Sequence, residues 1–194
     1  MKKTVYCAGD MLKKGSILLR EQEARDLRNI GCKVYSPIED KSINDKSNQT
    51  EDSNNNLAER IVRNDTRGIL ESDIIVIEPH ENALGTMVEL GQIKGYKDCA
   101  RELENIIERV VKLKCNDSQA VNRLSMELHL LIKKLDKKVY PHLEDIRRTN
   151  IPECGDRRSW SINQYVYGVC LDLTDGKGFY EWDEILEELE KEVN

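Results

Sequence analysis

The segment DIIVIE, residues 73–78, does most to limit the folds open to this chain. Four β-branched residues stand between two acids, so the apolar positions are consecutive rather than alternating. Such a run is typical of a strand that is buried on both faces, as in a parallel sheet covered by helices. It predicts an α/β architecture in which strands alternate with helices.

The first forty residues support this architecture. Residues 4–8, TVYCA, and residues 32–37, CKVYSP, form two further apolar stretches. Between them, from about Ser16, apolar residues recur near the helical period of 3.6, and Gly31 stands where a helix commonly ends. The pattern predicts a strand, a crossover helix and a second parallel strand.

The rest of the chain repeats the alternation. A helix is expected over residues 57–70, strands over 138–143 (KVYPHL) and 165–173 (YVYGVCLDL), and an amphipathic helix over 182–193. These elements predict one domain over residues 1–194, built on a flavodoxin-like, doubly wound, five-stranded parallel sheet. Sheets of this kind bind ligands beyond the carboxyl ends of their strands.

Two segments exceed this core pattern. Residues 97–136 carry apolar positions at helical spacing on both sides of a break at Asn116 and Asp117, which predicts a helical-hairpin insertion with a role in packing or oligomerisation. Residues 40–56 are almost wholly polar and cannot bury enough apolar area to order themselves. They are expected to form a mobile loop, either near the substrate site or as a plain surface insertion.

The overall charge and the cysteines limit the partners and the compartment. The net charge of -6 argues against nonspecific binding to nucleic-acid polymers, and no apolar run approaches the ~20 residues that span a membrane. The six cysteines show no CxxC pair, so free thiols in a reducing cytoplasm are expected. The GxGxxG and P-loop motifs are missing, and no cofactor or metal is expected.

One carboxylate stands out against its neighbours. Glu89 lies among small and apolar residues in ALGTMVELG, near the predicted start of the helix that follows DIIVIE. Free N–H groups there could hold a costly buried carboxylate ionised, and an ionised, desolvated carboxylate is a competent nucleophile. The alternatives are structural: Glu89 as a helix-terminal acid, Tyr6 as a core aromatic, and Asp65 as a solvated helix residue.

The order of three segments resembles the nucleoside 2-deoxyribosyltransferase family. The segments TVYCAGDM, VRNDTRGILESDIIVIE and LGTMVELG span roughly residues 4–96, and the similarity resumes at SINQYVYGV. The resemblance implies that Glu89 attacks the anomeric carbon of a 2′-deoxyribose, that Tyr6 orients Glu89, and that Asp65 helps the base to leave. It also implies a homo-oligomer, with Asn163 and Tyr165 reaching into a neighbour's site, and substrate contacts near Gly9 and Gly85.

The residues expected to bind the 5′ end depart from that family. Transferases of the family often carry an acid six residues before the nucleophile, where it binds the 5′-hydroxyl, and related nucleotide hydrolases carry a serine there. This chain has Ala83, with Glu81 and Asn82 as neighbouring substitutes. The segment that contains Arg147, Arg148, Arg157, Arg158 and Trp160 either binds a phosphate and stacks on a base, or is a surface loop with salt bridges.

Three functions follow from the sequence. The first is base exchange between deoxynucleosides, with free nucleobases as second substrates. The second is hydrolysis of 2′-deoxynucleoside 5′-monophosphates. The third, of another class, is a nucleotide-binding domain without chemistry.

Overall fold

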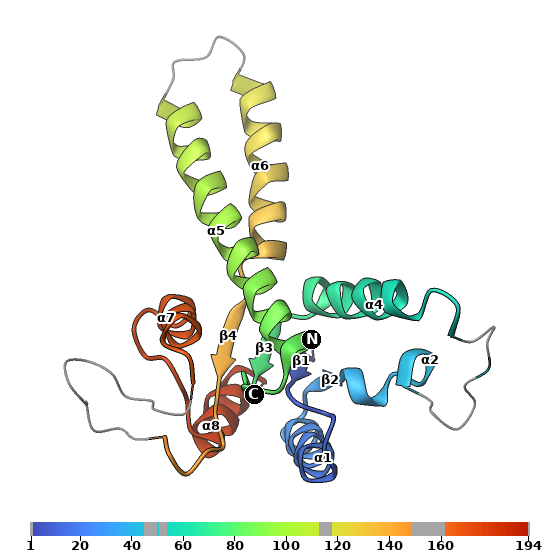
Figure 1. Ribbon diagram of the computed structural model, residues 1–194. Helices are drawn as coiled ribbons and strands as arrows, with labels where there is room; N and C mark the ends of the chain where they lie inside the picture. Colours follow the sequence, from blue (N-terminus) through green and yellow to red (C-terminus); the bar gives the residue numbers. More distant parts are fainter. Residues whose placement is uncertain (1, 45–49, 51–53, 113–117, 149–161, 194) are drawn as a thin grey trace.

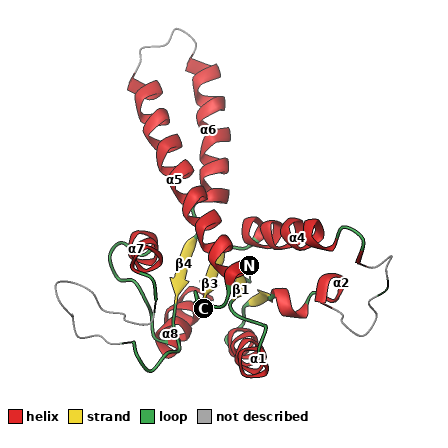
Figure 2. Cartoon of the chain, in the orientation of Figure 1, coloured by secondary structure: helices red, strands yellow, loops and turns green. Residues whose placement is uncertain are grey.

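Four parallel strands form the centre of the molecule (Figures 1 and 2). The computed structural model describes residues 2–44, 50, 54–112, 118–148 and 162–193. The strands are β1 (Thr4–Ala8), β2 (Lys33–Tyr35), β3 (Ile74–Ile77) and β4 (Lys138–Pro141), in the order β2-β1-β3-β4. All three pairings are parallel, and the register sets Tyr6 beside Tyr35 on β2 and beside Ile75 on β3.

Helices cover both faces of this sheet. The face that carries Tyr6 and Ala8 packs against α4 (Leu57–Glu71), α5 (Leu84–Lys112) and α7 (Gln164–Leu173). The face that carries Val5 and Cys7 packs against α1 (Lys14–Asn29) and α8 (Trp182–Val193). Because β3 is buried at every position, its consecutive apolar residues fill both cores.

The predicted fifth strand is wrong. The segment YVYGVCLDL lies in helix α7, whose buried residues Tyr167, Cys170 and Leu173 recur at helical spacing. Asn163 caps this helix by accepting a hydrogen bond from the backbone N–H of Tyr165 at 2.8 Å. Beside β4, in the described residues, a single bridge between His142 and Tyr180 stands where a fifth strand would pair.

The other predicted elements correspond to observed ones. The first helix ends as expected, and Gly31 follows it at φ +99°, a conformation that favours glycine. Inside the predicted polar loop, the structure contains the short helix α2 (Lys41–Asn44), which follows a 3₁₀ turn, η1 (Pro37–Glu39). Residues 45–49 and 51–53 of that loop lie outside the described part of the chain.

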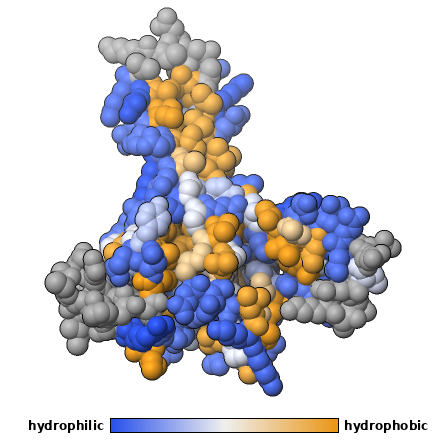
Figure 3. Space-filling model, in the orientation of Figure 1, coloured by the Kyte–Doolittle hydropathy of each residue, from blue (hydrophilic) through white to orange (hydrophobic). Residues whose placement is uncertain are grey.

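The expected helical hairpin extends away from the sheet (Figure 1). It consists of α6 (Ser118–Leu135) and the second half of α5, so the insertion continues the helix that contains Glu89. The predicted break at Asn116 and Asp117 lies outside the described residues. A small core of Ala100, Ile107 and Ile132 joins the two helices. Other apolar residues of the hairpin face solvent (Figure 3): Ile106, Leu124, Met126, Leu130 and Leu131.

Candidate active site

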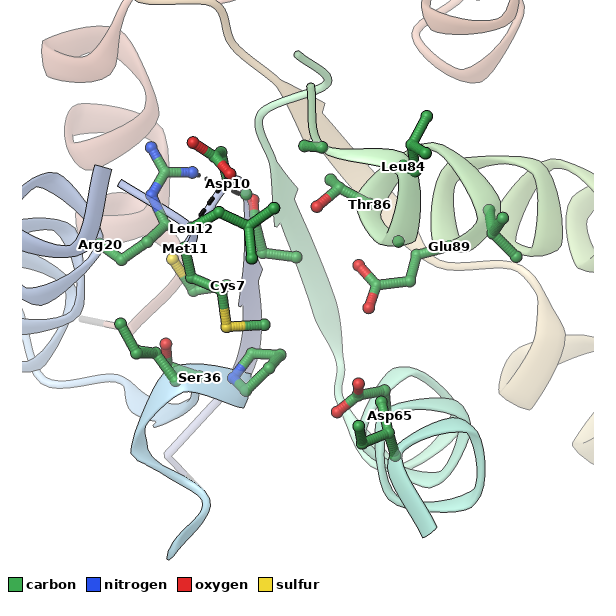
Figure 4. A pocket seen from close by; sticks show the side chains of 18 of the residues that line it. Cys7, Asp10, Met11, Leu12, Arg20, Ser36, Asp65, Leu84, Thr86 and Glu89 are labelled. Atoms are coloured by element: carbon green, nitrogen blue, oxygen red, sulfur yellow. Dashed lines mark hydrogen bonds between the residues drawn. The ribbon is translucent and has the colours of Figure 1, made fainter. Parts of the chain in front are cut away.

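A cavity of about 380 Å³ lies where the sheet order reverses between β1 and β3. Its walls come from the end of β1 and the loop after it, from residues 36–38, from α4, and from the first turns of α5. Most side chains in these walls are apolar, and the polar exceptions include Asp10, Asp65 and Glu89 (Figure 4). A concave apolar site with a few polar groups at this point of a doubly wound sheet is typical of a small-molecule site.

Glu89 reaches this cavity from the second turn of α5 and is held from behind by Tyr6. The Tyr6 hydroxyl donates a hydrogen bond of 2.9 Å to Glu89 Oε1. Tyr6 is fully buried within β1, and it is not among the residues that line the cavity. Burial and the nearby carboxylates raise the pKa of Tyr6, so that its hydroxyl stays protonated as a donor. Tyr6 therefore positions Glu89 and leaves the other side of the carboxylate open to a ligand.

Asp65 enters the same cavity from α4. Its side chain is 6 % exposed, and it accepts a long hydrogen bond of 3.4 Å from the Tyr35 hydroxyl, which also lies 3.3 Å from Asp40. The Tyr35 ring stacks on the Tyr6 ring with centroids 5.6 Å apart. Of the two stacked tyrosines, Tyr6 thus donates to Glu89, and Tyr35 shares its single hydroxyl proton between Asp65 and Asp40.

Both carboxylates hold their protons more tightly than usual. Burial raises the pKa of Glu89 to about 7; the hydrogen bond from Tyr6 opposes this rise and the charge of Asp65 adds to it. Burial also raises the pKa of Asp65 to about 6, against the hydrogen bond from Tyr35. The sequence predicted that free N–H groups at the start of the helix could hold Glu89 ionised, but α5 begins at Leu84 and Glu89 lies in its second turn. The free N–H groups of a helix are in its first turn, and Glu89 lies beyond that turn. Desolvation therefore has the largest effect on the pKa of Glu89.

Two glycines let the walls of the site approach closely. At Gly9, an added Cβ would lie 1.6 Å from Nη1 of the buried Arg20. At Gly68 on α4, an added Cβ would lie 2.8 Å from the Tyr35 ring and 3.0 Å from the Tyr6 ring. Gly9 and Gly85, near which the family resemblance predicts substrate contacts, both line the cavity.

Asn163 and Tyr165 do not line this cavity. Both lie at the exposed start of α7, and Tyr165 is 83 % exposed. Their place on the surface leaves open the predicted role in a neighbouring subunit's site.

The arginine-rich segment is only partly described. Trp160, Arg157 and Arg158 lie outside the described residues. Arg147 pairs with Asp145 at 2.6 Å, and Arg148 pairs with Glu181 at 2.6 Å. Each of these two arginines already has a carboxylate partner, which favours the salt-bridge interpretation for them.

Sequence reasoning missed several residues of the cavity wall. Asp10 directly follows Gly9 at the end of β1 and is 6 % exposed. Arg20 lies beneath Gly9, and Gln92 lies one helical turn after Glu89. The position of Asp10 directly after a predicted parallel strand was the signal available, because such positions face the ligand edge of the sheet. Glu81 and Asn82, the suggested substitutes near the 5′ end, are exposed and do not line the cavity.

The described residues contain no group of three His, Cys, Asp or Glu side chains arranged to hold a metal ion. The four cysteines in this part of the chain are free thiols. No helix among the same residues has the length and apolar character needed to cross a membrane.

Comparison with known proteins supports the fold. No family model and no curated protein sequence matches the chain. A solved structure of a conserved protein from Enterococcus faecalis V583 is similar over 100 % of both chains, with a TM-score of 0.59 and 18 % identity. A 2-deoxyribosyltransferase from Bacillus psychrosaccharolyticus matches over 94 % of this chain and 90 % of its own, with a TM-score of 0.49 and 16 % identity. The first likeness shows that this α/β fold with a parallel sheet occurs over the full length of another protein.

Proposed function

We propose that this protein is a nucleoside 2-deoxyribosyltransferase that moves 2-deoxyribose from one nucleobase to another. The observation that carries the proposal is the presence of a buried carboxylate, Asp65, and a part-buried one, Glu89, in one apolar cavity, with Glu89 oriented by the 2.9 Å hydrogen bond from Tyr6. Cleavage of a glycosidic bond with retention needs a carboxylate nucleophile on one face of the sugar and acid assistance to the leaving group.

The proposed reaction has two displacements at C1′. In the first, a Glu89 oxygen forms a bond to C1′ while the C1′–N bond breaks, and its electron pair leaves with the base. Asp65 gives its proton to the departing base. A second base then enters and gives a proton to Asp65. A nitrogen of this base displaces Glu89 from C1′. The two inversions give retention, and the apolar walls limit capture of the intermediate by water.

Product analysis tests this proposal. The protein is incubated with each of the four common deoxynucleosides and, separately, with their 5′-monophosphates, with and without a second free base, and products are separated by chromatography. We expect a new nucleoside only when the second base is present. Release of free deoxyribose, or of deoxyribose 5-phosphate from a monophosphate, at the same rate with and without the second base would instead support a hydrolase. The absence of any turnover would support a domain that only binds.

The role of Glu89 is tested by substitution and trapping. We expect Glu89→Ala to lower the exchange rate at least ~10³-fold, which is roughly 4 kcal/mol of barrier. A 2-fluoro-2-deoxynucleoside slows turnover of the covalent intermediate, and mass spectrometry of the wild-type protein should then find one added sugar on the peptide that contains Glu89. A label on another peptide, or wild-type rates in the alanine variant, would contradict the proposal.

A further inference from the structure

The charged side chains of the cavity are unequally balanced. Three acids line it, namely Asp10, Asp65 and Glu89, against one cation, Arg20. Arg20 Nη2 donates to Glu23 at 2.8 Å and to Glu78 at 2.6 Å, and its Nη1 donates to the carbonyl of Ala8 at 3.3 Å. Its positive charge is thus compensated by two carboxylates behind the cavity wall. The described walls offer a phosphate group no uncompensated cation.

Asp10 lines this wall and is held there as an ionised carboxylate that accepts hydrogen bonds. One carboxylate oxygen accepts a hydrogen bond of 2.6 Å from the Ser16 hydroxyl, and the other accepts one of 3.1 Å from the Leu12 N–H. Burial raises the pKa of Asp10, but these hydrogen bonds and the nearby His80 and Lys13 outweigh it, and the net pKa is lowered. A carboxylate has about four acceptor sites, so Asp10 can accept a further hydrogen bond from a ligand.

The three acids lie one after another along the cavity in space. Figure 4 shows Glu89 between Asp10 on one side and Asp65 on the other. Under the proposed function, C1′ of the sugar lies at Glu89 and the base lies toward Asp65. The base is attached at C1′ and C5′ at C4′, on either side of the ring oxygen, so with the base toward Asp65 the 5′ end of a nucleoside in this pose extends toward Asp10.

We propose that Asp10 binds the 5′-hydroxyl of the sugar and thereby selects nucleosides over nucleoside 5′-monophosphates. A hydroxyl can donate a hydrogen bond to the carboxylate, whereas a phosphate dianion has no proton to donate and is repelled by it. Asp10 would supply, from the loop after β1, the acid that is missing at Ala83 in the sequence. This inference rests on the proposed function and adds the substrate class.

Binding to a catalytically inactive variant tests the inference. In the Glu89→Ala background, calorimetry measures the affinity for the best-bound of the four deoxynucleosides, its 5′-monophosphate and its 2′,5′-dideoxy analogue. We expect the monophosphate and the dideoxy analogue each to bind at least about tenfold more weakly, the size of a hydrogen bond to a charged group. Comparing the dideoxy analogue needs no change to Asp10, so it tests the contact even if Asp10 variants fold poorly.

Substitution of Asp10 completes the test. We expect Asp10→Asn to reduce the preference for nucleoside over monophosphate by at least about tenfold, because the repulsion is gone and the N-terminus of α5 remains nearby. Glu81→Gln is the matched control, since Glu81 is an exposed acid outside the cavity, and it should leave the preference unchanged.

The outcomes separate the two proposals. A monophosphate that binds as tightly as the nucleoside, or an unchanged preference in a folded Asp10→Asn variant, would overturn the role of Asp10, while base exchange by the wild-type protein would still support the proposed function. If no deoxynucleoside and no monophosphate bound, and no base were exchanged, the proposed function and this inference would both fall.

Discussion

At the scale of single residues, the chemistry depends on how many protons the two acids share. The pKa of Asp65 is raised to about 6 and that of Glu89 to about 7, in both cases chiefly by burial. Between these values the pair carries about one proton. The higher pKa of Glu89, which already includes the opposing hydrogen bond from Tyr6, places this proton mainly on Glu89, whereas the proposed reaction needs the proton on Asp65 and an ionised Glu89. The reactive form is therefore the less populated of the two singly protonated forms of the pair.

This proton count predicts a bell-shaped pH dependence. We expect kcat/KM for base exchange to be highest between about pH 6 and about pH 7. It falls on the acid side, where both acids are protonated, and on the alkaline side, where neither is. Asp65→Asn should lower the rate and remove the alkaline limb, while the acid limb remains. A profile that is flat from pH 5 to 8 in the wild-type protein would contradict this assignment.

Ionised Glu89 should also lower the free energy of unfolding above neutral pH. Its pKa is about 7 in the folded protein against an ordinary value of 4.5 for glutamate, so the folded state binds more protons between these values and stability falls as pH rises through them. We expect Glu89→Gln to be stabilising at pH 8, by at most about 3 kcal/mol, and nearly neutral at pH 4.5. Chemical denaturation at both pH values measures this.

A control separates this effect from a general loss of negative charge. Glu21→Gln removes an exposed acid of α1 and should change stability little at either pH. An equal gain in stability for Glu89→Gln at both pH values would show that the charge of the part-buried Glu89 is not the cause.

At the scale of elements, the site depends on how closely α4 approaches the sheet. Gly68 lies inside α4, where alanine would ordinarily be favoured over glycine by up to about 1 kcal/mol. Here an added methyl group would press on both tyrosine rings, at 2.8 Å from Tyr35 and 3.0 Å from Tyr6. Glycine at this position therefore lets α4 pack closely on the rings of Tyr6 and Tyr35, whose hydroxyls contact Glu89 and Asp65.

A pair of glycine substitutions tests this point. We expect Gly68→Ala to lower the exchange rate at least about tenfold, because displaced tyrosines lose hydrogen bonds to charged groups. Gly95→Ala on α5 is the matched control, since its Cβ would meet no atom within 4 Å. It should raise stability by about 0.5–1 kcal/mol and leave the rate unchanged. Equal rates for both variants would show that the approach of α4 does not set the tyrosines.

At the scale of the whole molecule, two exposed features favour association of subunits. The hairpin of α5 and α6 displays apolar residues to solvent (Figure 3), and Tyr165 is 83 % exposed beside Asn163. Exposed apolar area of this kind often marks an interface. Asn163 does not line the cavity of its own chain, which is compatible with the predicted role in the site of a neighbouring subunit.

Mixing two inactive variants tests whether sites are shared. We expect Glu89→Ala and Asn163→Ala homo-oligomers each to be weakly active. In a homodimer with shared sites, random mixing of subunits gives one intact site in every mixed dimer, and activity returns to about a quarter of wild type. Light scattering checks the oligomeric state. Activity that stays at the level of the unmixed variants, or a fully active monomer, would contradict shared sites.

Local patterns in the sequence were enough to predict most of the fold. The first four strands, the closing helix and the hairpin follow from the period of apolar residues, because backbone hydrogen bonding and side-chain direction repeat within a few residues. The resemblance also singled out Tyr6, Asp65 and Glu89, which the structure brings together.

Tertiary structure decided what these patterns leave open. The segment of α7 has a composition that suits either a strand or a helix, and burial of Tyr167, Cys170 and Leu173 against the sheet selects the helix. The contact between Tyr6 and Glu89 joins residues 83 positions apart, and the raised pKa of Glu89 comes from the desolvation that this packing causes. Asp10 becomes a candidate for the same reason, because only the folded chain brings the end of β1, α4 and α5 around one cavity.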